Sequence, residues 1–454
     1  MKRIFIIVLI LIVHCTLKIE DCLCQSGWIQ QTSGTNASLS KVYFINLNTG
    51  WISTGNSSVL KTTNGGINWI PYSVPNTCSL YSVRFIDSSV GYTVSGVNVS
   101  QYLSYQYLFK TINGGINWSL AYQSSASFEF RYFNDVFPLD YNNVFLTEAG
   151  SGSMSTVGGF YKSTNGGNIF SGLISINQNY NGISFINSNT GWVISYWNSD
   201  VPVARSRIFR TTNSGLNFVK QFDDSASLIL MKLNRIIAVN QNVVYAIANR
   251  TYSPKTVLMK TTNGGINWDT TKYNHEKNSA LFFITESTGW IGGYSGNDSS
   301  AIARTTNGGA NWVLQHRRIN AGITDIFFVN NETGWAVGYG GLILKTTNGG
   351  IMNVKKENNM IPLTFSLYQN YPNPFNPVTK IKFSLKEEGR LKIQEVKLVI
   401  YDILGKEIST LVNEALQPGT YEVTFDGSNL ASGIYFYQLR AGDFVETKKL
   451  ILLK

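Results

Sequence analysis

Short apolar runs alternate with polar turns along most of the chain, and one of these turns is repeated. It is the nonapeptide KTTNGGINW or a close variant, which occurs seven times between residues 61 and 353. An apolar stretch precedes each copy, and tryptophan or phenylalanine closes six of the seven. This order predicts a strand, a tight turn and a second strand.

The spacing of the repeat predicts the fold. The last residues of successive copies are 41 to 52 positions apart, which is close to the length of a four-stranded propeller blade. A second hairpin pattern precedes the nonapeptide, as in residues 44–51 (FINLNTGW), and is weaker in the third and fifth repeats, at 137–145 and 239–245. We therefore expect an all-β chain with a seven-bladed β-propeller over residues 25–353.

The last repeat lacks the material for its fourth strand. It ends in Ile-Met-Asn at residues 351–353, without a closing aromatic residue, and a polar segment follows. Residues 27–31 (GWIQQ), near the other end of the propeller, look like the sequence that follows the other nonapeptides. We predict that residues 28–31 form the outer strand of the seventh blade and pair with residues 342–346. That pairing would close the ring.

The nonapeptide, called the box below, carries its own turn chemistry. Its hydroxyl and Asn side chains can bond backbone groups of the turn, and its second Gly can take a positive φ. The closing aromatic contributes on the order of 2–3 kcal/mol when buried. In four copies these positions are Thr62, Asn64, Gly66, Trp69, Thr111, Asn113, Gly115, Trp118, Thr261, Asn263, Gly265, Trp268, Thr305, Asn307, Gly309 and Trp312.

At these residues the chain resembles the Asp-box, or bacterial neuraminidase repeat, family, whose pattern is Ser/Thr-x-Asp-x-Gly-x-x-Trp. Asn replaces the Asp in every copy here. In that family the box is a folding element placed away from the active face, so the resemblance implies a fold and no chemistry. The boxes combined with Gly-Trp hairpins are also similar to the photosystem II assembly and stability factor family. That likeness covers residues 28–353 and implies a non-enzymatic propeller that binds other proteins.

The N-terminus predicts export. Lys2 and Arg3 precede an apolar run over residues 4–13, which suits a signal peptide and is short for a membrane span. We expect residues 1–24 to be removed, leaving no transmembrane span in the mature chain. Cys78 would then be the one remaining cysteine, so we expect no internal disulfide.

A second module follows the propeller. Residues 354–363 begin with a polar stretch and are expected to be a linker, and residues 364–454 alternate strands with Pro and Gly turns, which predicts a small Ig-like β-sandwich. These segments resemble the type IX secretion system sorting domain. The matching motif residues are Asn373, Pro374, Phe375, Asn376, Pro377, Tyr401, Asp402, Gly405, Gly433, Tyr435, Lys448 and Lys449.

The resemblance of the tail implies a destination. The type IX translocon and its processing machinery would recognise the tail, commonly remove it, and either release the propeller or attach it to the cell surface. An accessory Ig-like module without a transport role is the alternative reading of the same residues. Removal of residues 364–454 would distinguish the two.

The charge of the chain points to no nucleic-acid partner. Its formal net charge is +10, yet no run of five like charges occurs, and a nucleic-acid binder would need a basic stripe. A cation heads each box, and these seven could form a ring that attracts an anionic polysaccharide. We favour the simpler reading, a solvated position repeated because the blade is duplicated. The cations are Lys61, Lys110, Lys162, Arg210, Lys260, Arg304 and Lys345.

The sequence offers candidate residues for an enzyme, but no complete set. A sialidase needs three arginines, a Tyr nucleophile with a Glu partner and an acid/base Asp, and no Arg-Ile-Pro segment typical of that family is present. A xyloglucanase-like glycosidase needs paired carboxylates and usually two rings. Acidic residues occur near strand ends, where caps of solvated turns are commoner than catalytic groups. They are Asp87, Asp135, Asp140, Glu148 and Asp325.

Metal and cofactor sites have less support. His275 and His316 are far apart without His or Cys companions, and no P-loop or dinucleotide fingerprint occurs. Aromatic loops offer binding surfaces at residues 102–107 and 196–203, and a Ser/Gly-rich loop does so at 150–159. We therefore expect an exported propeller that binds a protein or a polysaccharide without a cofactor or a catalytic step. A glycan-cleaving enzyme is the competing hypothesis.

Overall fold

The computed structural model describes residues 27–453 with short gaps. The gaps are 76–78, 101–102, 128–129, 152–157, 175–177, 198–204, 225–230, 251–254, 277, 296–298, 320–321, 351–353, 359–361, 388–393, 417 and 429. The chain divides into two compact units, Ser26–Met352 and one that contains Asn353–Lys454. Each is described by itself.

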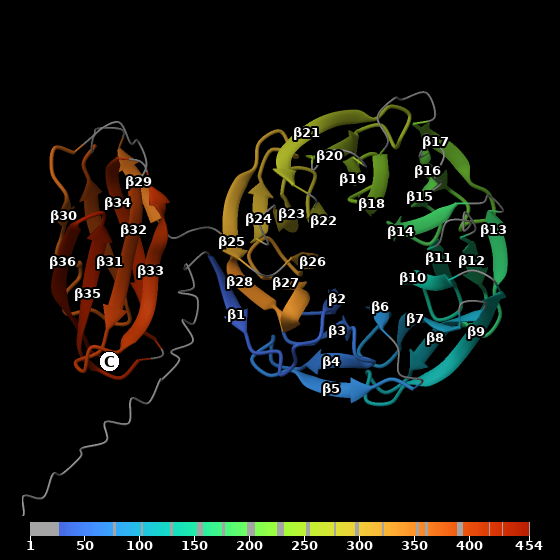
Figure 1. Cartoon of the computed structure of the whole chain (residues 1–454), viewed down its shortest axis with the longest axis horizontal. Helices are drawn as coiled ribbons and strands as arrows, with labels where there is room; N and C mark the ends of the chain where they lie inside the picture. Colours follow the sequence, from blue (N-terminus) through green and yellow to red (C-terminus); the bar gives the residue numbers. More distant parts are fainter. Residues whose placement is uncertain are drawn as a thin grey trace, which may run out of the picture. The chain divides into compact units, whose positions relative to one another are not determined.

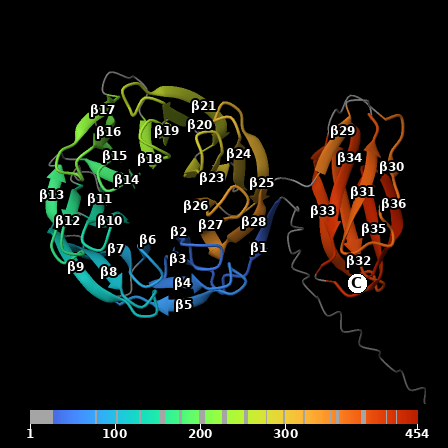
Figure 2. The same cartoon turned by 180° about the vertical axis from the view of Figure 1, so that it is seen from behind.

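The first unit is a ring of seven four-stranded antiparallel sheets (Figure 1). Each blade places its first strand nearest the centre and its fourth at the outside (Figures 1 and 2). The first three blades are β2 (Leu39–Phe44), β3 (Gly50–Thr54), β4 (Ser58–Thr62), β5 (Ile70–Ser73); β6 (Leu80–Phe85), β7 (Gly91–Ser100), β8 (Leu103–Thr111), β9 (Ser119–Ser127); and β10 (Phe130–Pro138), β11 (Val144–Ser151), β12 (Phe160–Ser163), β13 (Ser171–Ile174).

The remaining blades repeat this order. They are β14 (Asn179–Phe185), β15 (Gly191–Trp197), β16 (Arg205–Thr211), β17 (Val219–Asp223); β18 (Met231–Ala238), β19 (Val244–Arg250), β20 (Lys255–Thr261), β21 (Asp269–Glu276); β22 (Asn278–Phe283), β23 (Gly289–Ser295), β24 (Ser299–Thr305), β25 (Val313–Ile319); and β26 (Ile323–Phe328), β27 (Gly334–Gly338), β28 (Ile343–Gly350) with β1 (Gly27–Gln31). A single 3-10 turn, η1 (Tyr339–Gly341), joins β27 to β28.

The ring closes through its N-terminal strand, as predicted. β1 pairs with β28, with Ile29 opposite Lys345 and Gln31 opposite Ile343. Trp28 is 2% exposed and meets the Phe328 ring edge-on at 5.6 Å. In the first blade, the box residue Trp69 meets the Phe44 ring in the same way at 5.9 Å. Trp28 therefore provides the closing aromatic that the seventh box lacks.

Aromatic stacks hold neighbouring blades together. In three of the four Gly-Trp hairpins, the Trp lies flat on the Phe that ends the inner strand of the next blade, as Trp51 does on Phe85 at 3.6 Å. The exception is Trp192, because the next inner strand ends in Ala238. The Gly before each hairpin Trp lies under its own blade's Phe: a Cβ at Gly50 would be 2.5 Å from the Phe44 ring. The weaker fifth repeat keeps the stack, because Tyr245 lies on Phe283 at 3.6 Å. The hairpin motif thus encodes packing between blades.

Every inner strand contains a bulge at the same place. The register shifts between Leu39 and Lys41 in the first blade, and at the equivalent position in the other six. Polar residues at the bulge bond the backbone of the next blade: Asn181 donates to the Leu233 carbonyl at 3.0 Å, and Thr324 to that of Leu39 at 2.6 Å. The bulges therefore help to join the inner strands around the centre.

The second unit is a sandwich of two four-stranded sheets around one core. Ile381, Phe383 and Val423 of one sheet share that core with Leu398 and Leu439 of the other. The sheets have the orders β29-β34-β31-β30 and β33-β32-β35-β36. The strands are β29 (Val354–Asn358), β30 (Ser366–Leu367), β31 (Val378–Leu385), β32 (Gln394–Tyr401), β33 (Glu407–Leu416), β34 (Gly419–Asp426), β35 (Gly433–Ala441) and β36 (Phe444–Leu452).

One strand of the sandwich lies where the sequence predicted a linker. Val354–Asn358 fall within residues 354–363 but form β29, which pairs with β34. The sequence VKKEN looked like a linker because it is charged. Pairing at a sheet edge needs only backbone groups, and charged side chains are common on edge strands.

Candidate functional site

The boxes form the turns that the sequence predicted. The Thr62 hydroxyl accepts the Gly66 amide at 2.8 Å, and the Asn64 side chain accepts the Asn68 amide at 3.0 Å. Gly66 has φ +92°. The adjacent Gly65 amide donates to the Asn48 carbonyl at 2.8 Å, so each box lies beside the turn between the first two strands of its blade. The Thr hydroxyl and the Asn side chain of each box therefore stabilise its own turn.

The cations that head the boxes are not a solvated ring, which corrects our expectation. Each lies over the aromatic ring opposite it on the second strand, as Lys110 does over Tyr92 at 5.3 Å and Arg210 over Trp192 at 5.1 Å. Lys110 also donates to the Gly166 carbonyl in the next box at 3.2 Å. Burial lowers the pKa of Lys61 and of Lys345. These cations link one blade to the next.

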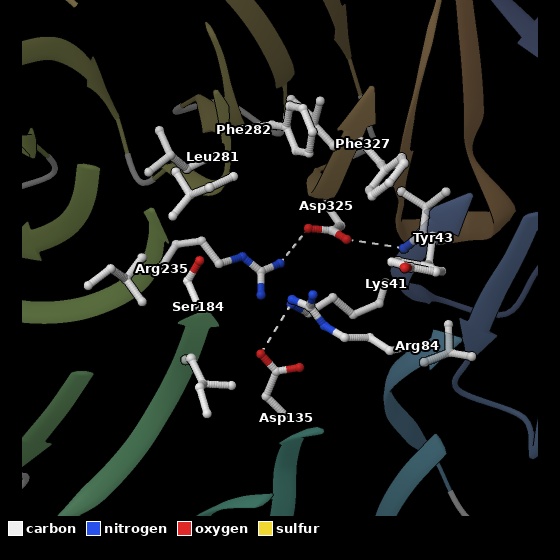
Figure 3. Close-up of a pocket in the computed structure, with 17 residues that line it drawn as sticks. Lys41, Tyr43, Arg84, Asp135, Ser184, Arg235, Leu281, Phe282, Asp325 and Phe327 are labelled. Carbon is white, nitrogen blue, oxygen red and sulfur yellow. Dashed lines mark hydrogen bonds and ion pairs between the residues drawn. The ribbon is translucent and has the colours of Figure 1, made fainter. Parts of the chain in front are cut away.

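Charged side chains from the inner strands gather around a cavity of about 100 Å³ in the centre of the ring (Figure 3). The Nζ of Lys41 lies 3.7 Å from a carboxylate oxygen of Asp135, and the Nη2 of Arg235 lies 2.5 Å from one of Asp325. Arg84 points toward the same space and stacks over Phe137 at 4.7 Å. Tyr43, Phe282 and Phe327 lie beside these charges.

Four of the five charges occupy one position of the repeat, the residue after the bulge, whereas Arg84 lies two positions beyond it in the second blade. In blades one, three, five and seven the residue after the bulge is Lys41, Asp135, Arg235 and Asp325. In the three blades between them it is small, namely Ser82, Gly182 and Ala280. The small residues leave room for the long side chains to reach across the ring.

Both carboxylates of the cavity are held by further donors. Asp135 accepts the Ser82 hydroxyl at 2.6 Å and the Val136 amide at 3.1 Å. Asp325 accepts the Val42 amide at 3.1 Å, in addition to Arg235. The carboxylates are therefore fixed in place before any ligand binds.

The environment of the cavity shifts the pKa of three of its groups, and burial raises that of Tyr43. Burial, with the positive charge of Arg235, lowers the pKa of Lys41 to about 8, although Asp135 opposes this shift. Burial raises the pKa of Asp135, but the nearby cations, first Lys41 and then Arg84, outweigh it, so the pKa is below its ordinary value. Asp135 is a stable carboxylate at neutral pH and has no proton to donate.

The other candidate acids have structural partners. Asp87 accepts the Ser89 and Val90 amides at 2.7 Å each, and Asp140 accepts the Asn142 amide at 2.8 Å. Both are turn caps. Asp87 also accepts the Tyr141 hydroxyl.

Glu148 lies in a different setting, within the third blade. It is 2% exposed, accepts the Tyr161 hydroxyl at 2.8 Å and lies 3.8 Å from Arg131. A Tyr, a Glu and an Arg are residue types that a sialidase uses. However, burial and Glu148 raise the pKa of Tyr161 well above its ordinary range, so this hydroxyl is a poor nucleophile.

An aromatic surface lies at the starts of the inner strands, at the opposite end of these strands from the boxes. We call Tyr81, Phe130, Tyr132, Tyr196 and Lys232 the tyrosine band. The Tyr81 and Tyr132 rings are 4.7 Å apart, and the Phe130 and Tyr132 rings 5.6 Å apart. The Nζ of Lys232 lies 4.4 Å from the Tyr196 ring. All but Tyr196 are partly or fully exposed.

The tyrosine band and the central charges were only partly visible in the sequence. Asp135 and Asp325 were among the predicted acids, whereas the roles of Lys41 and Arg235 were missed. Alignment of the inner strands on their bulges would have found both, since they then share one column. Residues 1–24, Cys78, Tyr102 and most of the loops 150–159 and 196–203 lie outside the described residues.

Among the residues that the structure describes, no group of three His, Cys, Asp or Glu side chains is placed to hold a metal ion. No helix in that part of the chain is long and apolar enough to cross a membrane.

In the sandwich, the opening motif contacts the final strand. Phe375 is 2% exposed, and its amide donates to the Ile451 carbonyl at 2.9 Å. The Asn373 side chain accepts the Ile451 amide at 2.9 Å. Asp402 accepts the Leu404 and Lys406 amides at 2.9 Å each, in a turn where Gly405 has φ +80°.

The closing motif lies on the final strand itself. Lys448 forms an ion pair with Glu446 at 3.0 Å, and the Lys449 carbonyl accepts the Gln369 side chain at 2.8 Å. Tyr435, on the neighbouring strand, donates to the Ala431 carbonyl at 2.9 Å. The motifs that open and close this segment of the sequence therefore meet in space.

Known proteins resemble each of the two units. Residues 369–453 match the family model of the secretion system C-terminal sorting domain. The structure is similar to "YCF48 bound to D1 peptide", with TM-score 0.52 and 16% identity, over 72% of this chain and 99% of that one. It is also similar to "YCF48 from Cyanidioschyzon merolae", with TM-score 0.51 and 16% identity, over 70% of this chain and 98% of that one. No curated protein matched the sequence.

These comparisons agree with the geometry of each unit. The likeness to YCF48, a photosystem II assembly factor, concerns the fold of the propeller. The match of the sandwich concerns the route of the protein through the cell envelope. The chain thus carries a C-terminal sorting domain of the type IX secretion system, which directs it to the cell surface or the extracellular space.

Proposed function

We propose that the propeller is a non-enzymatic binding module that presents the tyrosine band to a protein ligand after export. The proposal rests on the contacts within the tyrosine band, in which Tyr81 and Phe130 both contact Tyr132, and Lys232 lies over Tyr196. Its rings come from three neighbouring blades, and Lys232 of a fourth lies at its end. Partly exposed tyrosines offer a large contact area at little cost in side-chain entropy.

The cavity supports a function without catalysis. Ligand pockets usually enclose about 300–1,000 Å³, whereas this cavity holds about 100 Å³. A glycosidase needs one carboxyl group kept protonated as general acid, and the low pKa of Asp135 disfavours that role. YCF48, a relative in fold, was solved with a bound peptide, which favours a protein ligand over a glycan.

A direct test uses the mature full chain. A displayed random-peptide library and a glycan array are screened for binders, and the affinity of each is measured with Tyr81→Ala and Tyr132→Ala. We expect enriched peptides whose affinity falls at least tenfold in both variants. Tyr141→Ala is the matched control, since Tyr141 is a 56% exposed tyrosine beside a box, and it should bind as the wild type does.

Three other results would contradict the proposal. Binders that are insensitive to both tyrosine substitutions would place the binding surface elsewhere. Glycans enriched in place of peptides would make the ligand a polysaccharide. Release of reducing sugar that is lost in Asp135→Asn would make the protein a glycosidase.

We also propose the processing that accompanies export. Residues 1–24 are removed as a signal peptide, the propeller spans residues 25–353, and the sorting domain at 364–454 is cut from it after transport. The motif residues Asn373 and Phe375 keep the last strand of the tail in place for recognition. Intact mass and N-terminal sequencing of the surface form test the two cleavages separately.

A further inference from the structure

Among the charged side chains of the central cavity, hydrogen-bond donors outnumber acceptors. Lys41 has three N–H groups, and Arg84 and Arg235 have five each. Against these stand the oxygens of Asp135 and Asp325, which Ser82 and backbone amides already partly occupy. Three cations and two carboxylates leave a net positive charge. A complementary ligand must therefore be rich in acceptors and negatively charged.

The size of the cavity restricts that ligand. The cavity has a volume of about 100 Å³, well below the roughly 300–1,000 Å³ of pockets that enclose drug-sized ligands. A small oxyanion needs space of this order, whereas a sugar ring or a peptide side chain with its backbone needs more. The side chains of Asp135 and Asp325 are 3% and 9% exposed, so the site is shielded from bulk solvent.

The three cations suit an oxyanion in different ways. The planar guanidinium groups of Arg84 and Arg235 can each donate two parallel hydrogen bonds to an oxyanion, and Lys41 adds a point charge. Phe137 supports the Arg84 guanidinium from one side at 4.7 Å. Arg235 is fixed by Asp325. The site is thus largely formed before a ligand arrives.

We propose that this cavity is a binding site for a small free oxyanion of the sulfate or phosphate class, held by Lys41, Arg84 and Arg235. Binding would satisfy the surplus donors and offset the repulsion among the three cations. It would therefore stabilise the ring from its centre. The cavity contains none of the residues of the tyrosine band. A test of this proposal is therefore independent of the proposed ligand of that band.

The test is a titration of sulfate into the mature full chain, with sodium chloride as the control at matched ionic strength. We expect saturable binding by calorimetry and a rise in melting temperature that chloride does not reproduce. Arg84→Met should weaken sulfate binding at least tenfold, and Arg84→Lys less. Lys220→Met, which removes a 52% exposed cation from an outer strand, should bind as the wild type does.

A second variant keeps the test decisive if Arg84→Met fails to fold. Ser184 lines the cavity, so Ser184→Asp would place a carboxylate there. We expect it to abolish the sulfate-dependent rise in melting temperature while the chain stays folded. Equal effects of sulfate and chloride, or an unchanged sulfate response in Ser184→Asp and in any folded Arg84 variant, would overturn the proposal and leave water as the occupant.

The pH dependence provides a further readout, because sulfate keeps its charge over the range used. Lys41 is faced by Arg84, Arg235, Asp135 and Asp325 and has a pKa of about 8. Sulfate affinity should therefore fall several-fold between pH 7 and pH 9 as Lys41 loses its proton. A constant affinity over this range would exclude Lys41 from the site.

Discussion

The Nε1 of Trp335 donates a hydrogen bond to the carbonyl of Gly65, 3.2 Å away, across 270 residues of sequence. Trp335 belongs to the last blade and Gly65 to the box of the first. Trp51 and Trp290 make the equivalent bond to the boxes of the blades that follow them. The last and first blades are therefore joined by the same hydrogen bond that joins other neighbouring blades. The closing strand β1 adds the fourth strand that the last blade needs.

Trp28→Ala should lower the free energy of unfolding of the propeller by about 3–5 kcal/mol, as is usual when a buried Trp is truncated. Trp28 is 2% exposed and also donates to the Gln315 side chain at 3.2 Å. Chemical denaturation measures the change. Ile29→Ala, on the same strand but 60% exposed, should have little effect. A melting curve unchanged by deletion of residues 25–33 would refute closure through β1.

Thr62→Val should destabilise the first blade by about 1–3 kcal/mol, because the buried Gly66 amide loses its acceptor. The Thr62 hydroxyl accepts this amide at 2.8 Å. Thr62→Ser keeps the hydroxyl and should remain within about 1 kcal/mol of the wild type. Equal losses in the two variants would show that the methyl group, and not the hydroxyl, stabilises the box.

Lys110→Met should cost about 1–2 kcal/mol, since it removes the contact with the Tyr92 ring and a hydrogen bond to the next box. The apolar stem of the side chain is kept. Lys220→Met is the comparison, because exposed ion pairs contribute little. If both variants unfold at the same denaturant concentration as the wild type, the head cations are solvated after all.

Asp224→Asn should remove a pH dependence of stability. Asp224 is 4% exposed, and burial, helped by Asp223 and opposed by the hydrogen bond from Ser206, raises its pKa to about 6. The folded state therefore binds this proton more tightly than the unfolded state, whose ordinary value is 3.8. The resulting stability is present below about pH 4 and is lost as the pH rises through 6.

Melting temperatures from pH 4 to pH 7 check this expectation. The difference between Asp224→Asn and the wild type should grow in favour of the variant as the pH rises, and it should level off above pH 6. A difference that stays constant over the range would show that Asp224 has the same pKa in both states. Asp269→Asn, on the outer strand β21, controls for the change in net charge.

Deletion of residues 364–454 should prevent delivery to the cell surface, because the sorting domain is the part that the translocon recognises. Asn373→Ala should reduce delivery less, since it removes only the bond to the Ile451 amide. Cell fractionation with an antibody against the propeller measures both. Surface delivery of the deleted form would contradict the sorting role.

The sequence alone predicts those features that depend on local spacing. The bonds within a box join residues at most four positions apart, as those of Thr62 and Asn64 do, so one copy suffices to predict them. The closing strand could be predicted because the sequence around Trp28 resembles the sequence that follows the other boxes. The prediction for the cations that head the boxes was wrong, because their partners are an aromatic ring on the neighbouring strand and a carbonyl in the next blade, as Tyr92 and Gly166 are for Lys110.

The proximity of the central charges could not be predicted from local spacing in the sequence. Lys41, Asp135, Arg235 and Asp325 come from four blades, and the distance between any two depends on how far the ring has turned between them. The bulge in each inner strand fixes which residue stands next to the cavity. Nothing in a single repeat marks that residue, since it is charged in some blades and small in others.

The alternation of charged and small residues around the cavity also constrains how this ring can evolve. A duplicated blade would place a second Lys41 or a second Asp325 beside the first, or would place two small residues next to each other. An unpaired charge in a shielded centre is costly. Gain or loss of a blade would therefore require compensating substitutions in the inner strands.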